Sequence, residues 1–370
     1  MGKLLLRLVC AFVLGGILVA GLWPFHAPQN QVSWLGQKNG LWFGKYGSVV
    51  SAGIFKTPAL PADNSCSLEI WLEPARVRSS GTILAFYLPA TGVIPFALRQ
   101  SWGDLVLRRP GPDSSHRNKK VKVYIDDVFS RQQPVLVSIS SGQAGTTVYA
   151  DGVFVRKVST FRLSTGDFNG RLIAGNSPIT TDNWSGQLRG LAIYDRELTA
   201  DEVSKHFAGW TKSSPVNLAG DSHTIALYRF DETGGRVVNN RMDAATDLLI
   251  PERFFLLHQK FLERPWDEFR PDWNYWKDVG INIAGFIPLG FFFCTYFWLV
   301  QRLKHPASLT IAMGFLVSLT IEVLQAFLPT RNSGMTDLIT NTFGTAIGVI
   351  LCRWALRLEG DPLEVRGAGA

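Results

Sequence analysis

Four long apolar stretches constrain this sequence more than any other feature. They run over residues 4–23, 279–300, 307–328 and 338–356, and each is close to the ~20 residues that a helix needs to cross the ~30 Å hydrocarbon core of a bilayer. The 370-residue chain is only 46% hydrophobic overall, so the remainder is polar enough to form a soluble domain. We therefore expect a membrane protein with four spans and one sizeable soluble domain.

Basic residues indicate how these spans are oriented. Lys3 and Arg7 open the first span, "QRLKH" (301–305) joins the second to the third, and Arg353 and Arg357 end the fourth. Because basic loops stay on the cytoplasmic side, both chain ends are expected in the cytoplasm. The long segment between the first two spans is then extracytoplasmic, and the expected location is the inner (plasma) membrane.

The charge and the cysteines narrow the possible partners. A formal charge of +7 is explained by cytoplasmic anchoring, so membrane lipids rather than nucleic acid are the expected partners. Only Cys66 lies outside the apolar stretches, and no CxxC occurs, so neither a disulfide framework, a metal site nor a cofactor is expected. No small-x-small cleavage site follows the first span, which favours an uncleaved anchor over a signal peptide.

The extracytoplasmic segment has the pattern of antiparallel β-structure. Short runs with period-two alternation, such as "SLEIWLEP", "GTILAFYL", "VLVSIS" and "GLAIYD", are separated by turn residues. Asp151-Gly152 lies between "TTVYA" and "VFVRK" and predicts a two-residue hairpin, since both positions tolerate positive φ. Many short strands at close intervals predict a sandwich of two sheets.

Three of these segments carry a family resemblance. "SCSLEIWLEP", "TTVYADGVFVRK" and "GQLRGLAIYDRELTADEVSKHF" resemble the laminin-G-like, concanavalin A-like jelly roll over about 31–250. The resemblance implies carbohydrate or protein binding, although many such domains only adhere or space. "IALYRFDETGG" resembles a strand that usually begins such domains but comes late here, so we expect permuted sheet edges.

Aromatic and charged residues suggest what this domain can bind. Trp71, Trp102 and Trp184 are candidates for stacking on sugar rings, although a core position is the commoner role of such residues. The basic cluster 116–122 is either an anion site or a solvated loop. Glycan hydrolysis needs two flanking carboxylates; the Glu-x-Asp-x-(x)-Glu run that hydrolytic relatives carry does not occur within residues 31–250, so we do not expect hydrolysis by this domain.

An aromatic segment precedes the second apolar stretch. The second half of residues 254–280 crowds tryptophans, tyrosine and phenylalanine at the predicted membrane boundary, which is typical of an interfacial belt. The predicted organisation is a transmembrane anchor (1–24), a sandwich (31–250), an interfacial linker (251–277), a three-helix membrane domain (278–357) and a cytoplasmic tail (358–370).

The later spans carry polar residues at their outer ends. Asp278 and Asn282 begin the second span, and Asp337 and Asn341 repeat the same spacing in the fourth. Residues four apart share a helix face, so each pair is expected on one side of its helix. Glu322 lies in the third span, about 10 Å below the helix end at Pro329 by helical rise.

These polar groups have a functional and a structural interpretation. An intramembrane carboxylate is costly unless it is paired or faces a cavity, so Glu322, Gln325 and the two Asp–Asn pairs predict a site, with Arg331 as counter-ion. The alternative is that the aspartates are helix caps and the asparagines join helices, which Gly285, Gly344 and Gly348 allow to approach closely.

The same residues carry a second family resemblance. "DVGINIAGFIPLGFFF" and "SLTIEVLQAFLPTRNSGMTDLITNTFGTAIG" resemble the VanZ-like membrane proteins, over about 278–353 together with the first span. The matching polar positions are Asp278, Asn282, Glu322, Gln325, Arg331, Asp337 and Asn341. The resemblance implies envelope association and a link to glycopeptide tolerance.

Three functions remain open at this stage. The first is an envelope protein whose sandwich binds an envelope glycan or lipid-linked saccharide; whether this protein forms a homo-oligomer is left open. The second is an enzyme acting on lipid-linked glycan or phosphate, with Glu322 or Asp337 as general base and Arg331 binding the anion. The third is a proton-coupled carrier that uses Glu322. No hydrolase or nucleophile motif supports the second.

Overall fold

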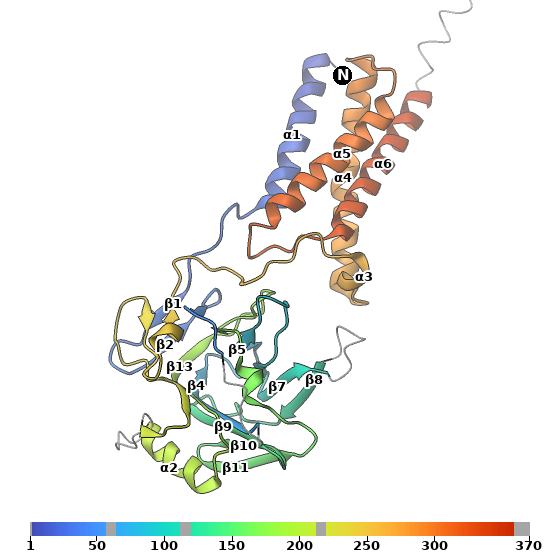
Figure 1. Ribbon diagram of the computed structural model, residues 1–370. Helices are drawn as coiled ribbons and strands as arrows, with labels where there is room; N and C mark the ends of the chain where they lie inside the picture. The colour runs from blue at the N-terminus through green and yellow to red at the C-terminus, as the bar shows by residue number, and fades with distance from the viewer. Residues whose placement is uncertain (1, 57–63, 112–119, 212–219, 359–370) are drawn as a thin grey trace, which may run out of the picture. The chain divides into compact units, whose positions relative to one another are not determined.

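The computed structural model describes residues 2–56, 64–111, 120–211 and 220–358, which form two compact units (Figure 1). One unit spans residues 28–258, and the other combines residues 1–27 with the chain from 259 onward. The first helix, α1 (Lys3–Leu22), therefore belongs to the same unit as the last three long helices. In sequence, the first unit is an insertion into the second.

The unit of residues 28–258 is a sandwich of two antiparallel sheets, as the sequence predicted. Within the described residues the first sheet has the order β1-β2-β13-β4-β9-β10-β11, with β14 also paired to β13, and the second has the order β15-β16-β3-β12-β5-β6-β7-β8. The strands are β1 (Val32–Trp34), β2 (Leu41–Phe43), β3 (Val49–Ser51), β4 (Cys66–Pro74), β5 (Ser80–Tyr87), β6 (Ala97–Ser101), β7 (Asp104–Pro110), β8 (Lys120–Ile125), β9 (Val135–Gly142), β10 (Gly145–Ala150), β11 (Val153–Val158), β12 (Arg171–Ala174), β13 (Gly186–Tyr194), β14 (Thr224–Tyr228), β15 (Val237–Val238) and β16 (Leu248–Leu249).

The hairpin predicted at Asp151-Gly152 is confirmed. β10 and β11 pair on either side of it, and both turn residues have positive φ, 51° and 80°. Two positive values in a two-residue loop match the right-handed twist of the flanking strands, so this turn sets the register of the hairpin.

The late strand β14 pairs with β13, off the main order of its sheet. It pairs with the second half of β13, while β2 pairs with the first half of the same edge. Two strands from opposite ends of the domain thus lie end to end along β13. This is the permuted edge that "IALYRF" predicted.

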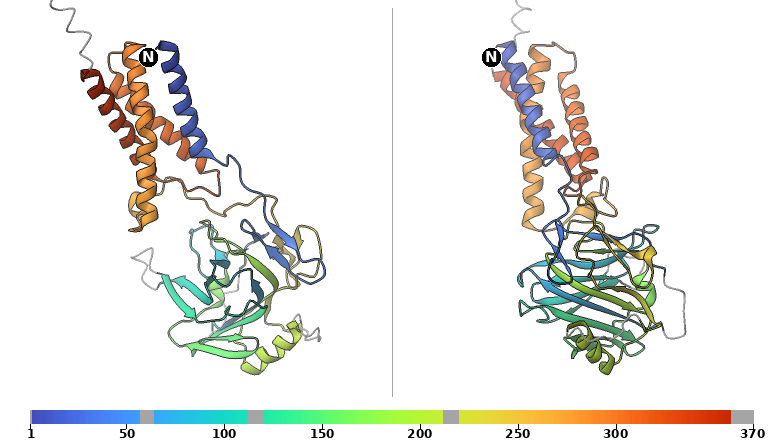
Figure 2. Two further views of the ribbon diagram at one scale, coloured as in Figure 1. Left: turned by 180° about the vertical axis from the view of Figure 1, so that it is seen from behind. Right: turned by 90° about the vertical axis from the view of Figure 1, so that its left-hand side faces the viewer.

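The core lies between the two sheets and contains large aromatic side chains. Phe43, Phe86, Phe168 and Trp184 are all at most 1% exposed and belong to one cluster. A helix, α2 (Ala200–Thr211), packs on the outer face of the first sheet through Val203 and other apolar residues. Figure 2 shows the two layers of strands with α2 outside them.

The chain that leaves the sandwich is part of its packing. Phe254 is fully buried, His258 stacks on Tyr87 with ring centroids 6.4 Å apart, and Asn30 donates to the carbonyl of Pro251 at 2.9 Å. Residues 251–258 therefore pack as part of the sandwich unit.

The second unit is a helical bundle of α1, α4 (Trp273–Leu299), α5 (Pro306–Gln325) and α6 (Met335–Leu358). In the described chain these four helices are long and apolar enough to cross a membrane. Their directions alternate in Figure 1. The starts of α4 and α6 therefore lie with the ends of α1 and α5, which we call the acidic end; the opposite end is the basic end.

α4 begins at Trp273, earlier than the predicted start at 279. The Asp272 side chain accepts from the amide of Tyr275 at 2.9 Å and is the helix cap, so Asp278 lies inside the helix and does not cap it. The cap interpretation of Asp278 was wrong, because polar and aromatic residues before the apolar stretch extend the helix beyond the lipid-soluble part.

Glycines bring α4 and α6 into close contact. A Cβ on Gly344 would lie 2.2 Å from the carbonyl oxygen of Ile283, and one on Gly348 would lie 2.1 Å from that of Ile287. Such small residues let helix backbones approach in lipid. Gly285 takes no part, since nothing lies within 4 Å of its Cβ position.

Candidate functional site

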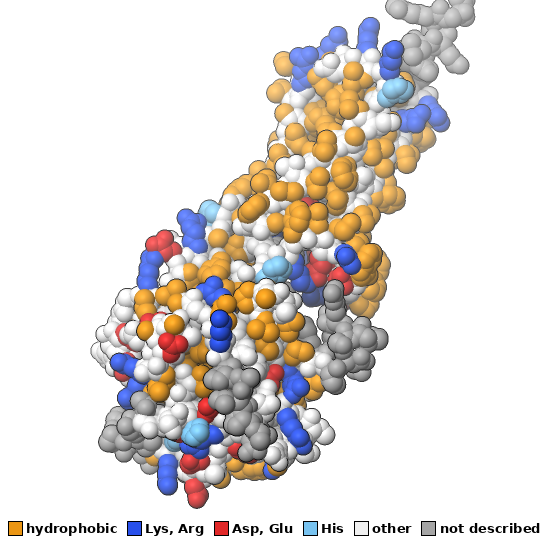
Figure 3. All heavy atoms as spheres, in the orientation of Figure 1, with side chains coloured by type: hydrophobic (Ala, Val, Ile, Leu, Met, Phe, Trp, Pro, Cys, Tyr) orange, Lys and Arg blue, Asp and Glu red, His pale blue; other side chains and the backbone are white. Residues whose placement is uncertain are grey.

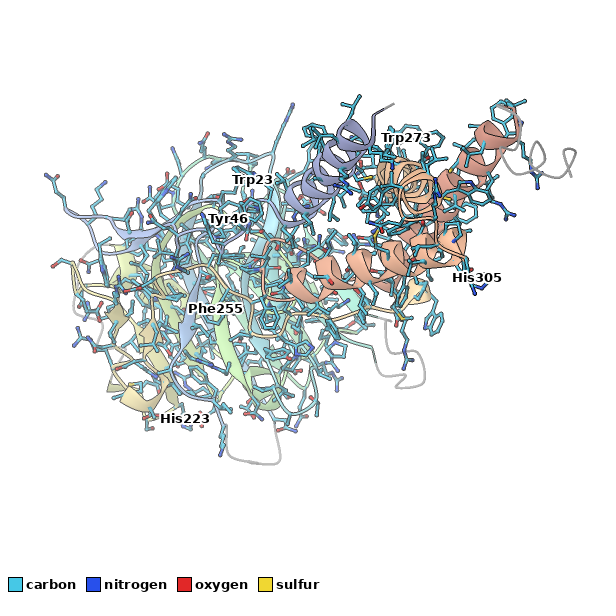
Figure 4. All side chains as sticks on the ribbon, turned by 90° about the horizontal axis from the view of Figure 1, so that it is seen from above. Trp23, Tyr46, His223, Phe255, Trp273 and His305 are labelled. Atoms are coloured by element: carbon cyan, nitrogen blue, oxygen red, sulfur yellow. The ribbon has the colours of Figure 1, made fainter. Side chains whose placement is uncertain are left out.

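The acidic end gathers carboxylates from three helices. Glu322 is in the last turn of α5, Asp337 is in the first turn of α6, and Glu268 ends the short helix α3 (Pro265–Glu268). Asp337 and Glu268 are neighbours of Glu322, and Asp278 is a further neighbour of Asp337. Figure 4 labels Trp23, which follows α1, and Trp273, at the start of α4.

Glu322 is the most deeply buried member of the group. Glu322 is only 1% exposed, and its Oε2 accepts a hydrogen bond from the amide of Gly334 at 2.8 Å. Gly334 directly precedes α6, where unpaired amides and the helix dipole favour a negative charge. The carboxylate therefore joins the end of α5 to the start of α6.

The loop between α5 and α6 is held over Glu322 by the segment before α3. Glu263 and Gly334 form a parallel bridge, and Met335 donates to the carbonyl of Glu263 at 2.9 Å. The Gln259 amide donates to the carbonyls of Gln325, Leu328 and Arg331 at 3.0, 2.6 and 3.0 Å. These bonds satisfy backbone acceptors at the end of α5 and in the loop that follows it.

Asp337 is more accessible than Glu322 and pairs with α4. Its Oδ1 accepts from the Asn282 amide at 2.8 Å. The aspartate of α6 thus pairs with the asparagine of α4, and not with Asn341 of its own helix. Glu268 accepts from both the amide and the hydroxyl of Thr336 and thereby caps α6. Asp278 is exposed at the rim.

The other predicted residues contact neighbouring helices. Asn341, one turn below Asp337, donates to the Ser318 hydroxyl of α5 at 3.0 Å. Gln325 donates to the carbonyl of Gly21 in α1 at 2.8 Å. Each amide group has one buried oxygen, Oδ1 of Asn341 and Oε1 of Gln325, that has no hydrogen-bond donor among the described residues.

Arg331 is not the counter-ion of Glu322. Its guanidinium donates to the carbonyl of Trp23 at 3.0 and 2.6 Å and to that of Ala20 at 3.5 Å. These carbonyls lie at the C-terminal end of α1, where the helix dipole attracts a cation. The predicted ion pair was wrong because the first helix, distant in sequence, places its terminal backbone carbonyls beside the arginine.

The acidic end is thus a set of acceptors without a basic partner. In the described part of the chain no ion pair involves Glu268, Asp278, Glu322 or Asp337. The same residues contain no group of three or more ligands with metal-binding geometry. Such a surface can bind ligands that donate hydrogen bonds.

Sequence reasoning missed Glu268. It lies in "RPWDEFRP", where aromatic residues dominate and predict only a membrane boundary. Pro265 at the first position of α3 and two acidic residues after it are a helix-start signal that was available. The belt itself stays a prediction, and its Trp266 and Trp273 are 72% and 79% exposed.

The three tryptophans predicted as candidates for sugar stacking have different environments. Trp184 is buried in the core and donates to Gln100 at 2.9 Å. Trp71 is covered by Arg189, whose guanidinium carbon lies 5.6 Å from the ring centroid. Of these three, Trp102 alone is open for stacking: it is 62% exposed at the β6–β7 turn and has a φ of 57°. Most of the predicted basic cluster, residues 116–119, lies outside the described residues.

A buried carboxylate in the sandwich has a structural role. Glu69 on β4 is fully buried and accepts from Tyr194, His206 and Trp210 at 3.0–3.1 Å. Burial, and next the Glu69 charge, raises the pKa of Tyr194 well above its usual range, so Tyr194 stays a donor. His206 and Trp210 are on α2, so the network attaches this helix to the sheet.

Comparison with protein families identifies both units. A family described as VanZ/LLP1 matches residues 224–356, and the concanavalin A-like lectin/glucanases superfamily matches residues 44–204. The VanZ/LLP1 match begins at β14 and so includes the last strands of the sandwich unit. A comparison with curated proteins gave no match.

Solved structures resemble the sandwich only loosely. A botulinum neurotoxin serotype D ligand-binding domain, solved with N-acetylneuraminic acid, matches with 12% identity and a TM-score of 0.36, covering 49% of this chain and 45% of that chain. A heptameric SAP-like pentraxin from Limulus polyphemus matches with 17% identity and a TM-score of 0.31, covering 48% and 78%. The chain thus spans less than half of the neurotoxin domain, and similarity at this level carries no argument about ligands.

Proposed function

We propose that this chain binds a lipid-linked saccharide or envelope glycan. A VanZ-like helical domain combined with a concanavalin A-like domain fits a membrane protein of the cell envelope. In this proposal it is a multi-pass protein of the inner (plasma) membrane, with the sandwich on the extracytoplasmic side. The sandwich binds sugar, and the acidic end of the helical unit binds the hydroxyl-bearing part of the same class of molecule.

The observation that carries this proposal is the group of unpaired carboxylates at the acidic end. Keeping Glu322 and Asp337 together without a cation is costly in an apolar helical unit, and such groups mark functional positions more often than structural ones. Sugar hydroxyls donate to carboxylates in charge-assisted hydrogen bonds. Asp337, Asp278 and Glu268 are the accessible members, and Glu322 lies behind them.

The same geometry argues against phosphate as the group bound here. An anion at this end would meet several carboxylates, and Arg331 would have to leave the carbonyls of Trp23 and Ala20 to reach it. The enzyme alternative that uses Arg331 to hold a phosphate therefore has no support from these contacts. We do not propose a catalytic role for Arg331.

Binding of an undecaprenyl-linked saccharide to the full chain in nanodiscs tests the membrane half of the proposal. We expect Asp337→Asn to weaken binding about tenfold, because a charged acceptor contributes about 1.5–3 kcal/mol. Asp267→Asn is the matched control, since Asp267 is an exposed neighbour on α3 outside the carboxylate group. Equal effects of both substitutions, or no binding by the native protein, would contradict the proposal.

The sugar-binding half is tested on a glycan array with the same nanodiscs. Trp102→Ala should remove binding, because stacking needs an accessible ring, whereas Phe154→Ala should not. Phe154 is 58% exposed on β11 and so controls for loss of any surface aromatic. A bound glycan that is unaffected by Trp102→Ala would move the sugar site elsewhere on the sandwich.

A proton-coupled carrier is the second candidate, and the burial of Glu322 favours it. A carboxylate shielded from solvent and without a cation is suited to binding and releasing a proton as its surroundings change. Proton flux into liposomes that contain the purified chain, lost in Glu322→Gln, is the result that this candidate requires.

A further inference from the structure

The basic end of the helical unit contains a cavity of about 230 Å³. The end of α4, the start of α5 and the last turns of α6 surround it. Its lining includes Lys304, His305 and Arg353, together with Trp298 and Ser308. Figure 3 shows Lys, Arg and His side chains gathered at this end of the helices, and Figure 4 labels His305 at the start of α5.

The cavity is lined by donors and positive charge. No carboxylate is in its lining, and neither Lys304 nor Arg353 forms an ion pair with any described residue. The two cations come from different parts of the chain, the α4–α5 loop and α6, and still converge on one space. Pro306 begins α5, and no side chain caps this helix. The cavity thus has the opposite chemistry to the acidic end.

We propose that this cavity binds a phosphate group, and that the phosphate is the headgroup of an anionic phospholipid. Basic pockets between membrane helices are suited to such headgroups. The guanidinium of Arg353 matches two phosphate oxygens, Lys304 adds a point charge, and the Ser308 hydroxyl donates a further hydrogen bond.

Apolar surface beside the cavity favours a lipid over a free phosphate. Ile350 and Trp354 on α6 are 64% and 62% exposed, and Leu309 on α5 is 45% exposed. An acyl chain attached to the bound headgroup has these side chains to lie against, whereas inorganic phosphate gains nothing from them. A tryptophan next to the headgroup position is also typical of the membrane interface.

Native mass spectrometry of the full chain, titrated in detergent with phosphatidylglycerol or phosphatidylcholine, tests the proposal. We expect retention of phosphatidylglycerol in preference to phosphatidylcholine. The single variants Lys304→Gln and Arg353→Gln should each weaken phosphatidylglycerol binding about fivefold, and the double variant about thirtyfold. Arg357→Gln is the control, because Arg357 is an exposed arginine of α6 outside the cavity lining.

Two outcomes would overturn the proposal. If Arg357→Gln weakens binding as much as Arg353→Gln, general surface charge and not the cavity attracts the lipid. If inorganic phosphate binds alone and the protein shows no preference between the two lipids, the ligand is a free anion. An unchanged melting temperature of each variant in detergent confirms that a lost lipid does not reflect a lost fold.

Discussion

At the scale of single residues, the hydrogen bond between Glu322 and Gly334 connects α5 to the start of α6 at the acidic end. The amide of Gly334 has the Glu322 carboxylate as its partner, and a buried donor left without an acceptor costs about 1–3 kcal/mol. The Glu322 carboxylate therefore stabilises the fold, in addition to any functional role. A test of function at this residue has to separate the two.

Two substitutions of Glu322 achieve that separation. Glu322→Gln keeps an acceptor oxygen for Gly334, so we expect the melting temperature in detergent to stay near that of the native chain. Glu322→Leu removes the acceptor and should lower stability by about 1–3 kcal/mol. Full function in the Gln variant, measured as saccharide binding and proton flux, would end both ionisable roles of this residue.

At the scale of elements, the α4–α6 contact depends on glycines. Gly344→Leu places a side chain where even a Cβ would lie 2.2 Å from a backbone oxygen, so we expect separation of the helices and a loss of about 1–3 kcal/mol or more. Gly285→Leu is the matched control, since its Cβ position is open. Thermal unfolding in detergent compares them; equal losses would mean that helix propensity and not packing sets the effect.

An acid-sensitive ion network holds the start of α2. Arg196 pairs with Asp221 at 2.7 Å and with Glu202 at 2.8 Å. Partial burial alone would raise the pKa of both carboxyls, but hydrogen bonds from Arg196 and from the amides of His223 and Thr199 outweigh it and lower both.

The sign of the pH dependence follows from these lowered pKa values. A carboxyl whose pKa is lower in the folded state binds fewer protons there, so it stabilises the fold above its unfolded pKa of about 4 and loses that contribution as the pH falls further. We expect the sandwich to lose stability below about pH 4, and Arg196→Gln to reduce that loss. Melting temperatures of the full chain between pH 7 and 3 measure it; an unchanged acid slope in the variant would exclude this network.

At the scale of the whole molecule, the sandwich is a closed unit in the middle of the chain. Residues 28–258 contain both sheets and their core, so we expect this fragment to fold alone with a β-type circular dichroism spectrum. A shorter fragment of residues 31–250 should melt at a lower temperature, because it lacks Phe254 and the bond between Asn30 and Pro251. Identical melting of the two fragments would show that residues 251–258 are not part of the fold.

The expected membrane topology is also a property of the whole chain. The helices alternate in direction (Figure 1), and basic residues lie at the end where α1 begins and α6 ends, so the positive-inside rule predicts both chain termini in the cytoplasm. Alkaline phosphatase joined at Thr211 should be active, and the same enzyme joined after Arg357 should be inactive. The reverse pattern would place the acidic end in the cytoplasm and remove the extracytoplasmic saccharide as its ligand.

Local patterns were sufficient for most of the fold. Apolar length predicted the four membrane-length helices, since the thickness of a bilayer selects that length. Alternation of apolar and polar residues predicted the longer strands, and Asp151-Gly152 predicted the register of one hairpin. Short strands such as β1, β15 and β16 escaped prediction, because two or three residues carry no periodicity. The seven polar positions of the membrane domain were also recognisable from sequence. The two Asp–Asn pairs repeat one spacing, Glu322 and Gln325 interrupt an apolar span, and Arg331 follows that span.

What the sequence could not decide was the pairing of those residues. Spacing placed Asp337 and Asn341 on one face, but the partner of Asp337 is Asn282 of another helix, and Glu322 meets a backbone amide in place of Arg331. Arg331 donates to the carbonyls at the end of α1. Glu268 comes from a segment whose aromatic residues predicted only a membrane boundary. A side chain's partner depends on which helices pack together and in what rotation, and that choice belongs to the tertiary structure, because it minimises unpaired buried groups over the whole bundle at once.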